Sequence, residues 1–223
     1  TARGGDFAIM YRTNAQSRLF EHSLMQEQIP YSIVGSLHFY QRKEIKDILA
    51  YLAAISNPSD NESLLRIINE PPRGIGQTSV GHLISFAAKA HISVSQALAS
   101  VGSINDLNAS AKKRIGEFAL KLNAWQHEAQ FSPAADLVKA VVEDLGLISM
   151  YNKSSDPKEI VRAENMIEFV ASVNEFSERF QKENDRPALL TDFLPFIALQ
   201  TDLDKVSDEL DSIRLMTLHN AKG

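Results

Sequence analysis

The strand-like segments of this chain lie near its two ends, and most of what separates them has the periodicity of helices. The runs at 6–12, 31–34 and 213–218 are short and apolar, of the kind that parallel sheets bury on both faces. From 42 to 200, apolar residues recur three and four positions apart, as they do on the buried sides of helices. We therefore expect strands from both ends to pair in one small parallel sheet, with a large helical insertion between them.

The predicted fold class is mainly α, and α+β overall. The first strand, an amphipathic helix over Ala15–Gln28 and the second strand form a strand–helix–strand unit, for which a parallel crossover is the default. The predicted boundaries are 1–35 and 208–223 for the pieces of an α/β domain, and 36–207 for the inserted helical subdomain. Because both ends fall close to core strands, we expect the chain to be a piece of a longer protein.

Two local expectations concern the joints between elements. Ser59 and Glu62 have the spacing of a capping box ahead of a helix. The stretch 201–211 is rich in Asp and Glu, which predicts a polar connector before the last strand.

Composition excludes several classes of protein. The 223 residues contain no Cys, so a disulfide framework and a thiolate metal site are excluded, and the six His residues form neither H-E-x-x-H nor a compact ligand cluster. No apolar run is long enough to span a bilayer. The net charge of −5 argues against indiscriminate coating of nucleic acid, while local basic patches remain compatible with it. Without G-x-x-x-x-G-K-[ST] there is no phosphate-binding loop, and we expect no catalytic residue.

The segment NEPPRGIGQTSVGHL, residues 69–83, contains the clearest candidate binding site. Two prolines end one helix, and a Gly-Ile-Gly turn precedes the next. Such a turn leaves the first amides of the new helix unpaired, and together with the helix dipole they suit a phosphate. In this helix-hairpin-helix form, Ile75 anchors the turn while Gly74 and Gly76 let a DNA backbone come close. The alternative is a turn between helices that binds no ligand.

Polar side chains accompany this turn in the sequence. Arg73 and Ser79 are expected to add a cation and a hydroxyl group, and Arg66 and Lys89 are further cations nearby in the chain.

Two other segments have the residue types that contact nucleic acid. YRTNAQSR places Arg12 and Asn14 where a strand ends, which is where ligands lie in open α/β sheets. The alternative is that Asn14 caps a helix and Arg18 is a solvated surface residue. HFYQRKEIKD interleaves Phe39 and Tyr40 with bases, as in surfaces that stack on unpaired nucleobases. The alternative here is that the aromatic rings belong to the core.

Four segments, taken in order, carry a resemblance to a known family. FAIMYRTNAQSR, IPYSIVGSLHFYQRKEIKDILAYL, PPRGIG and IRLMTLHNAKG resemble the UvrD/PcrA/Rep group of superfamily-one DNA helicases over nearly the whole chain. The resemblance implies the end of the first part of the second RecA-like motor domain (2A), its inserted subdomain (2B), and the strand that returns to the motor. This chain departs from the family at three positions, where members usually carry Arg, an acid and an acid: His38, Gln41 and Gln77.

The function that the resemblance implies is ATP-dependent unwinding of DNA with 3′ to 5′ polarity, in repair or replication. ATP and Mg²⁺ would be cofactors of the intact protein, and this chain alone would bind neither and be inactive as an ATPase. The implied partners are single-stranded and duplex DNA in 3′-tailed junctions, together with repair or replication proteins. The implied location is the bacterial cytoplasm, at the nucleoid, with no membrane.

The resemblance also implies roles for individual residues. The residues that line the single-stranded track would be Arg12, Asn14, Lys46, Thr217 and His219. The residues that contact duplex DNA would be Arg73, Gly74, Ile75, Gly76 and Ser79. The residues of motif V that couple the DNA track to the ATP cleft would be His219, Lys222 and Gly223.

Two other functions stay open. One is a helicase–nuclease subunit built on the same motor, which a nuclease domain further along the full chain would reveal. The other is a regulatory module, because the inserted subdomain can rotate and contact protein partners. Duplex binding by the chain itself would separate a DNA-binding function from a purely regulatory one.

Overall fold

The computed structural model describes residues 3–222 apart from 13–15, 28, 35–37, 208–210 and 219. Asn14, His219 and Gly223 therefore lie outside the described residues. The strands are β1 (Ala8–Tyr11), β2 (Tyr31–Val34) and β3 (Ile213–Thr217). The α-helices are α1 (Ser17–Gln26), α2 (Lys43–Ser56), α3 (Asn61–Ile67), α4 (Gln77–Ala90), α5 (Val94–Ala99), α6 (Ala109–Glu128), α7 (Ala134–Leu145), α8 (Leu147–Asn152), α9 (Pro157–Asn184) and α10 (Leu190–Ser207). The short 3₁₀ helices are η1 (Gly4–Asp6), η3 (Phe39–Gln41), η4 (Val101–Ser103) and η5 (Asn220–Lys222).

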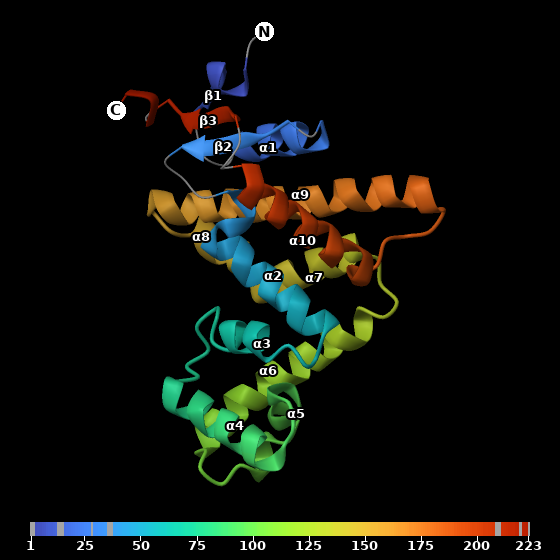
Figure 1. Ribbon diagram of the computed structural model, residues 1–223. Helices are drawn as coiled ribbons and strands as arrows, with labels where there is room; N and C mark the ends of the chain where they lie inside the picture. The colour runs from blue at the N-terminus through green and yellow to red at the C-terminus, as the bar shows by residue number, and fades with distance from the viewer. Residues whose placement is uncertain are drawn as a thin grey trace. The chain divides into compact units, whose positions relative to one another are not determined.

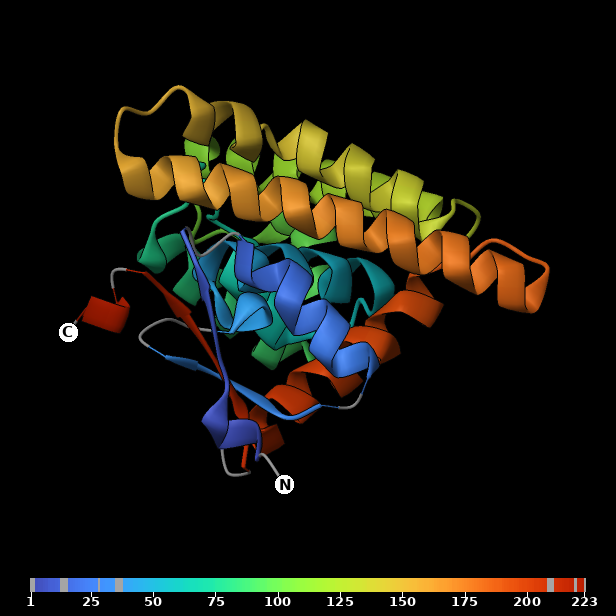
Figure 2. The ribbon, with the colours of Figure 1, turned by 90° about the horizontal axis from the view of Figure 1, so that it is seen from above.

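The three strands form one parallel sheet in the order β1-β3-β2 (Figures 1 and 2). Ile9 and Ile33 both lie opposite Leu215, one on each side of the central strand. The predicted mainly α fold with a small parallel sheet built from both ends of the chain is confirmed.

One face of the sheet is covered by α1. Tyr11, Tyr31 and Leu215 form a buried cluster with Leu24 of α1. Met10, in contrast, is 53% exposed. Within the described residues the strands therefore alternate between a covered and an open face, and burial of the second face stays a prediction. Apolar side chains on both sides of a short strand do not reveal which side a helix covers.

The chain divides into two compact units. One consists of residues 1–46, 148–175 and 192–223, and the other of residues 47–147 and 176–191. The first unit thus contains the sheet together with parts of α9 and α10. The predicted boundaries at 35 and 207 follow the change from strand to helix character, whereas the compact units follow the packing of the helices.

Two local expectations need correction. Asp60, and not Ser59, is the N-cap of α3, because its Oδ1 accepts a hydrogen bond from the Ser63 amide at 3.0 Å. Helix α10 continues to Ser207, so the predicted polar connector is helical over its first seven residues, 201–207. This stretch contains neither Gly nor Pro, so nothing in it breaks the helix. Residues 208–210 lie outside the described residues.

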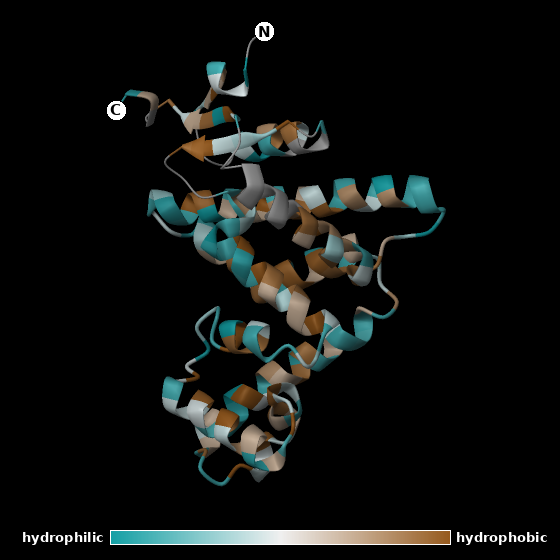
Figure 3. Cartoon of the chain, viewed as in Figure 1, coloured by the Kyte–Doolittle hydropathy of each residue, from teal (hydrophilic) through white to brown (hydrophobic). Residues whose placement is uncertain are grey.

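The helices of the second unit have the mixed surface that amphipathic packing requires. Figure 3 shows hydrophilic and hydrophobic residues interleaved along α4 and α6. On α6 the buried residues include Ile115, Phe118, Leu122 and Trp125, which recur at helical spacing. Among the described residues, none of the helices has the length and apolar character that crossing a membrane demands.

Candidate nucleic-acid interface

The Gly-Ile-Gly turn, residues 73–79, joins the segment after α3 to the start of α4. Its backbone is held by Asn69, whose Oδ1 accepts hydrogen bonds from the amides of Arg73 at 2.8 Å and Ile75 at 3.1 Å. Ile75 is 2% exposed, as the sequence predicted. Gly76 is the N-cap of α4. The turn is thus fixed by the buried side chain of Ile75 and by the hydrogen bonds that its amides donate to Asn69.

The guanidinium group of Arg73 is directed at the protein itself. Its Nη1 donates to the carbonyl oxygens of Ile67 at 2.9 Å and Glu70 at 3.0 Å, and its Nη2 donates to Tyr51 Oη. Its Cζ lies 4.7 Å from the centre of the Phe118 ring. The last carbonyls of a helix have no partner within the helix, and Arg73 supplies one for α3. The sequence assigned this side chain to a DNA phosphate, and the structure gives it internal partners.

Tyr51 connects Arg73 to the core of the second unit. Its hydroxyl donates to the Glu70 carbonyl at 2.5 Å, and its ring meets Trp125 edge to face at 5.9 Å. Burial raises the pKa of Tyr51 to about 12, although the positive charge of Arg73 acts in the opposite direction. The hydroxyl is therefore neutral at physiological pH, and it accepts from Arg73 while donating to Glu70, three residues before the turn.

The two glycines of the turn have different surroundings. Gly74 has φ +69°, and a β-carbon placed on it would lie 2.5 Å from Nη1 of Arg114. Gly76 has φ −75° and ψ 161°, and among the described residues no atom lies within 4 Å of the place of its β-carbon. The space expected over Gly74 is thus filled by Arg114, whereas the space over Gly76 is open to the outside.

The first turn of α4 follows Gly76 directly and carries backbone amide donors. Val80 is the first residue of the helix whose amide is bonded, to the Gly76 carbonyl at 3.1 Å. Among the described residues no acceptor serves the amides of Gln77, Thr78 and Ser79. The first turn has no acidic residue, so the positive end of the helix dipole is not neutralised there. An anion is the group that this arrangement suits.

The other cations named from the sequence are placed differently. Arg66 forms an ion pair with Asp47, with 2.7 Å between Nη2 and Oδ1. Lys89 is in the last turn of α4, roughly 18 Å along the helix axis from Gln77 at 1.5 Å per residue. Arg114, which sequence reasoning missed, does reach the turn, since its Nη1 donates to the Gly74 carbonyl at 2.7 Å. No local signal could have found it, because the two residues are 40 positions apart.

Two of the predicted track residues lie side by side at the carboxyl ends of their strands. Tyr11 pairs with Thr217 in the sheet, and the Leu218 amide donates to the Tyr11 carbonyl at 2.9 Å. Arg12 follows directly and is exposed, with its amide bonded to Gln16 Oε1 at 2.9 Å. Of the remaining track and motif V residues, Asn14, His219 and Gly223 are outside the described residues, and Lys222 is exposed in η5.

Lys46 is exposed near the start of α2, and buried charges hold that helix end to α1. Arg42 Nη2 donates to Ser17 Oγ at 2.8 Å and lies 3.8 Å from Glu21 Oε1. Burial lowers the pKa of Arg42, and the charge of Glu21 opposes this shift. The segment that carries Lys46 is thereby fixed to α1, the helix that follows Arg12 in the chain.

The aromatic residues of HFYQRKEIKD are part of the core. Phe39 and Tyr40 are 0% and 2% exposed, and the Arg18 guanidinium lies 5.2 Å and 5.3 Å from their ring centres. Arg18 is itself buried and donates to Tyr40 Oη at 3.0 Å. The hypothesis that these rings stack on nucleobases is wrong, and so is the alternative that Arg18 is a solvated surface residue. The rings are occupied by arginines of the protein.

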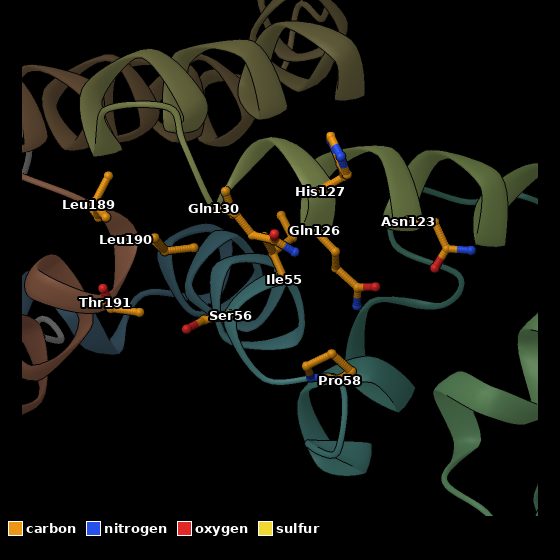
Figure 4. A pocket seen from close by; sticks show the side chains of 11 residues that line it. Ile55, Ser56, Pro58, Asn123, Gln126, His127, Gln130, Leu189, Leu190 and Thr191 are labelled. Atoms are coloured by element: carbon orange, nitrogen blue, oxygen red, sulfur yellow. The ribbon is translucent and has the colours of Figure 1, made fainter.

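A cleft of about 640 Å³ in the second unit is chemically unlike the turn. Figure 4 shows Asn123, Gln126 and His127 of α6 above Ser56 and Pro58, with Leu190 and Thr191 at one side. Its lining includes no Asp, Glu, Lys or Arg. It therefore offers no fixed charge to a phosphate backbone.

Comparison with known proteins gives a consistent result. The sequence profile of the UvrD-like helicase C-terminal domain matches residues 2–223. The chain is 38% identical over 219 residues to the ATP-dependent DNA helicase PcrA of Leuconostoc citreum, 37% over 224 residues to PcrA of Bacillus subtilis (strain 168), and 36% over 230 residues to UvrD1 of Mycobacterium bovis. Each match covers 98% of this chain, and the chain spans 29–30% of the length of these relatives. The chain belongs to the UvrD-like helicase C-terminal domain family.

Proposed function

We propose that this chain is the DNA-binding part of an ATP-dependent DNA helicase that unwinds duplex DNA with 3′ to 5′ polarity in repair or replication. The relatives are named as ATP-dependent DNA helicases. In the full-length protein, the Gly-Ile-Gly turn binds duplex DNA ahead of a 3′-tailed junction. Arg12, Asn14, Lys46, Thr217 and His219 line the single-stranded track. The setting is the nucleoid in the bacterial cytoplasm, and the partners are repair or replication proteins.

The observation that carries the proposal is the open space at Gly76 beside three unpaired amides of α4. A side chain at Gly76 is excluded neither by its φ and ψ nor by neighbouring atoms of the described residues. The absence of a side chain at Gly76 therefore mainly serves to let a ligand from outside the protein approach the backbone. Phosphate oxygens accept from amides at a helix start without reading bases, so this contact is independent of DNA sequence. Arg73 contributes by binding the carbonyls of Ile67 and Glu70 in the segment that leads into the turn, and Ile75 anchors the turn in the core.

ATP and Mg²⁺ belong to the intact protein, where nucleotide hydrolysis supplies the free energy for movement along DNA. This chain has no G-x-x-x-x-G-K-[ST] and should show no DNA-stimulated ATPase activity by itself. We further propose that His219, Lys222 and Gly223 couple the DNA track to the ATP cleft, as the family resemblance implies.

Two substitutions in the full-length protein test whether the Gly-Ile-Gly turn binds duplex DNA and whether Arg12 binds single-stranded DNA. Gly76→Val blocks the approach of a phosphate, so affinity for a 3′-tailed junction should fall roughly tenfold or more, as when one or two charge-assisted hydrogen bonds are lost. Single-strand affinity and single-strand-stimulated ATPase should stay near the parent values. Arg12→Ala should lower the affinity for single-stranded DNA and leave the affinity for the duplex part of the junction near the parent value, because it removes a cation from the single-stranded track. Equal losses on both DNA substrates for each variant, or no loss, would refute the division into a duplex site and a track.

A further inference from the structure

Arg114 of α6 is in direct contact with the Gly-Ile-Gly turn. Its Nη1 donates to the Gly74 carbonyl at 2.7 Å, and its guanidinium lies where a side chain of residue 74 would be, with Nη1 at 2.5 Å and Cζ at 3.0 Å from that β-carbon position. Gly74 is thus the residue that makes room for Arg114. The contact places a full positive charge two residues before Gly76.

Most of the hydrogen-bonding capacity of Arg114 is unused. A guanidinium has five N–H groups, and in the described part of the chain only the bond to Gly74 engages them. The side chain is exposed. Arg73 differs in both respects, since its two terminal nitrogens donate to carbonyls and to Tyr51.

The charges around Arg114 leave it available for an anion. Arg114 lines a groove together with Glu117, and the Glu117 carboxylate lies 4.0 Å from Lys113 Nζ. Asp144, also in the lining, accepts a hydrogen bond from Trp125 Nε1 at 3.1 Å. Lys121 and Arg73 also line the groove, so it holds three cationic side chains.

We propose that Arg114 is the cation of the duplex-binding turn, and that it contacts a DNA phosphate while Arg73 holds the turn in shape. The inference rests on the proposed function and extends it to a residue of another helix. One N–H anchored on Gly74 restricts the guanidinium, so less side-chain freedom is lost when its remaining donors meet phosphate oxygens.

Salt-dependent binding tests this assignment. Binding of a blunt DNA duplex to the 223-residue chain is measured from about 50 to 200 mM salt, where each neutralised phosphate adds about −0.9 to the slope of log affinity against log salt. Arg114→Gln should lower affinity roughly tenfold and reduce the magnitude of the slope by about one. Lys112→Gln is the matched control, because it removes an equal charge from the same helix, lies outside the groove and leaves the Lys113–Glu117 pair intact, so it should change the slope by much less. Arg114→Lys should keep the parent slope, since it retains the charge.

Each other outcome overturns the inference. If Arg114→Gln weakens binding with the parent slope, Arg114 only shapes the turn. If Arg114→Gln and Lys112→Gln weaken binding alike, the effect is one of net charge. If Arg114→Gln has no effect while Gly76→Val still weakens junction binding, Arg114 does not contact DNA. The proposed function then stays intact. If Gly76→Val is also without effect, the proposed function fails as well. Should Arg114→Gln unfold at lower temperature than its parent, Arg114→Met, which keeps the aliphatic stem over Gly74, replaces it.

Discussion

Replacing Arg73 by Ala should destabilise the second unit even without DNA. The substitution removes hydrogen bonds from a charged group to the carbonyls of Ile67 and Glu70 and to Tyr51 Oη, and it removes the contact with the Phe118 ring. Hydrogen bonds to charged groups contribute about 1.5–3 kcal/mol, and a desolvated cation–π contact contributes up to about 2 kcal/mol. Allowing for water at the half-buried site, we expect a loss of about 2–4 kcal/mol in the free energy of unfolding.

The chain offers a convenient reporter for this measurement. Trp125 is its single tryptophan and contacts Tyr51, so the fluorescence of Trp125 during urea unfolding follows the unit that contains Arg73. A loss of this size corresponds to a Tm lower by roughly 5–15 °C for a chain of this length. Arg73→Lys should lose about half as much, because it keeps the charge and not the planar fork. Lys113→Ala, at an exposed position, should change the free energy by less than about 0.5 kcal/mol. If Arg73→Ala is as stable as Lys113→Ala, the internal contacts of Arg73 do not hold the turn.

Two further predictions concern the same region. Gly74→Ala should lower the free energy of unfolding by about 1–2 kcal/mol, because φ is +69° at that residue. Gly76→Ala should change it by less than about 0.5 kcal/mol. Equal effects of the two substitutions in urea unfolding would contradict the distinction between the glycines. The raised pKa of Tyr51, about 12, means that its protonated form is favoured in the folded state, so its contribution is fully present below pH 10 and is lost as the pH rises to 12. Between these pH values the free energy of unfolding of the parent should fall by up to about 2.7 kcal/mol more than that of Tyr51→Phe. If the free energies of unfolding of the two proteins fall equally with pH, the pKa of Tyr51 is not raised by folding.

Much of the fold could be predicted because its signals are local. The strands at Ile9, Ile33 and Leu215 are short apolar runs, and their parallel pairing follows from the strand–helix–strand order. Most of the helices follow the spacing of their apolar residues. The N-cap of α3 was misplaced by one residue because Ser59, Asp60 and Asn61 are all residue types that can cap a helix.

The candidate site was predicted in part for the same reason. A turn with two glycines around a buried isoleucine can be predicted from consecutive residues, and so can an exposed arginine after a strand. The partners of the arginines could not be read in this way. Arg73 is bonded to Tyr51, which is 22 residues away, and Arg114 reaches Gly74 across 40 residues. An arginine that satisfies carbonyls and one that faces solvent look identical in sequence, and only the packing of α2, α3 and α6 distinguishes them.

The position of β3 in the sheet has a consequence for how the chain acquires its structure during synthesis. Because β3 lies between β1 and β2, neither of these strands can form its pairing within the described sheet until β3 has been made. Ser32 and Ser212, which are hydrogen-bonded across the sheet, are 180 residues apart. At ~5–20 residues per second, the ribosome needs roughly 9–36 s to make that length of chain. The local contacts of helices form in microseconds, so the helical segments have time to fold before β3 joins β1 and β2.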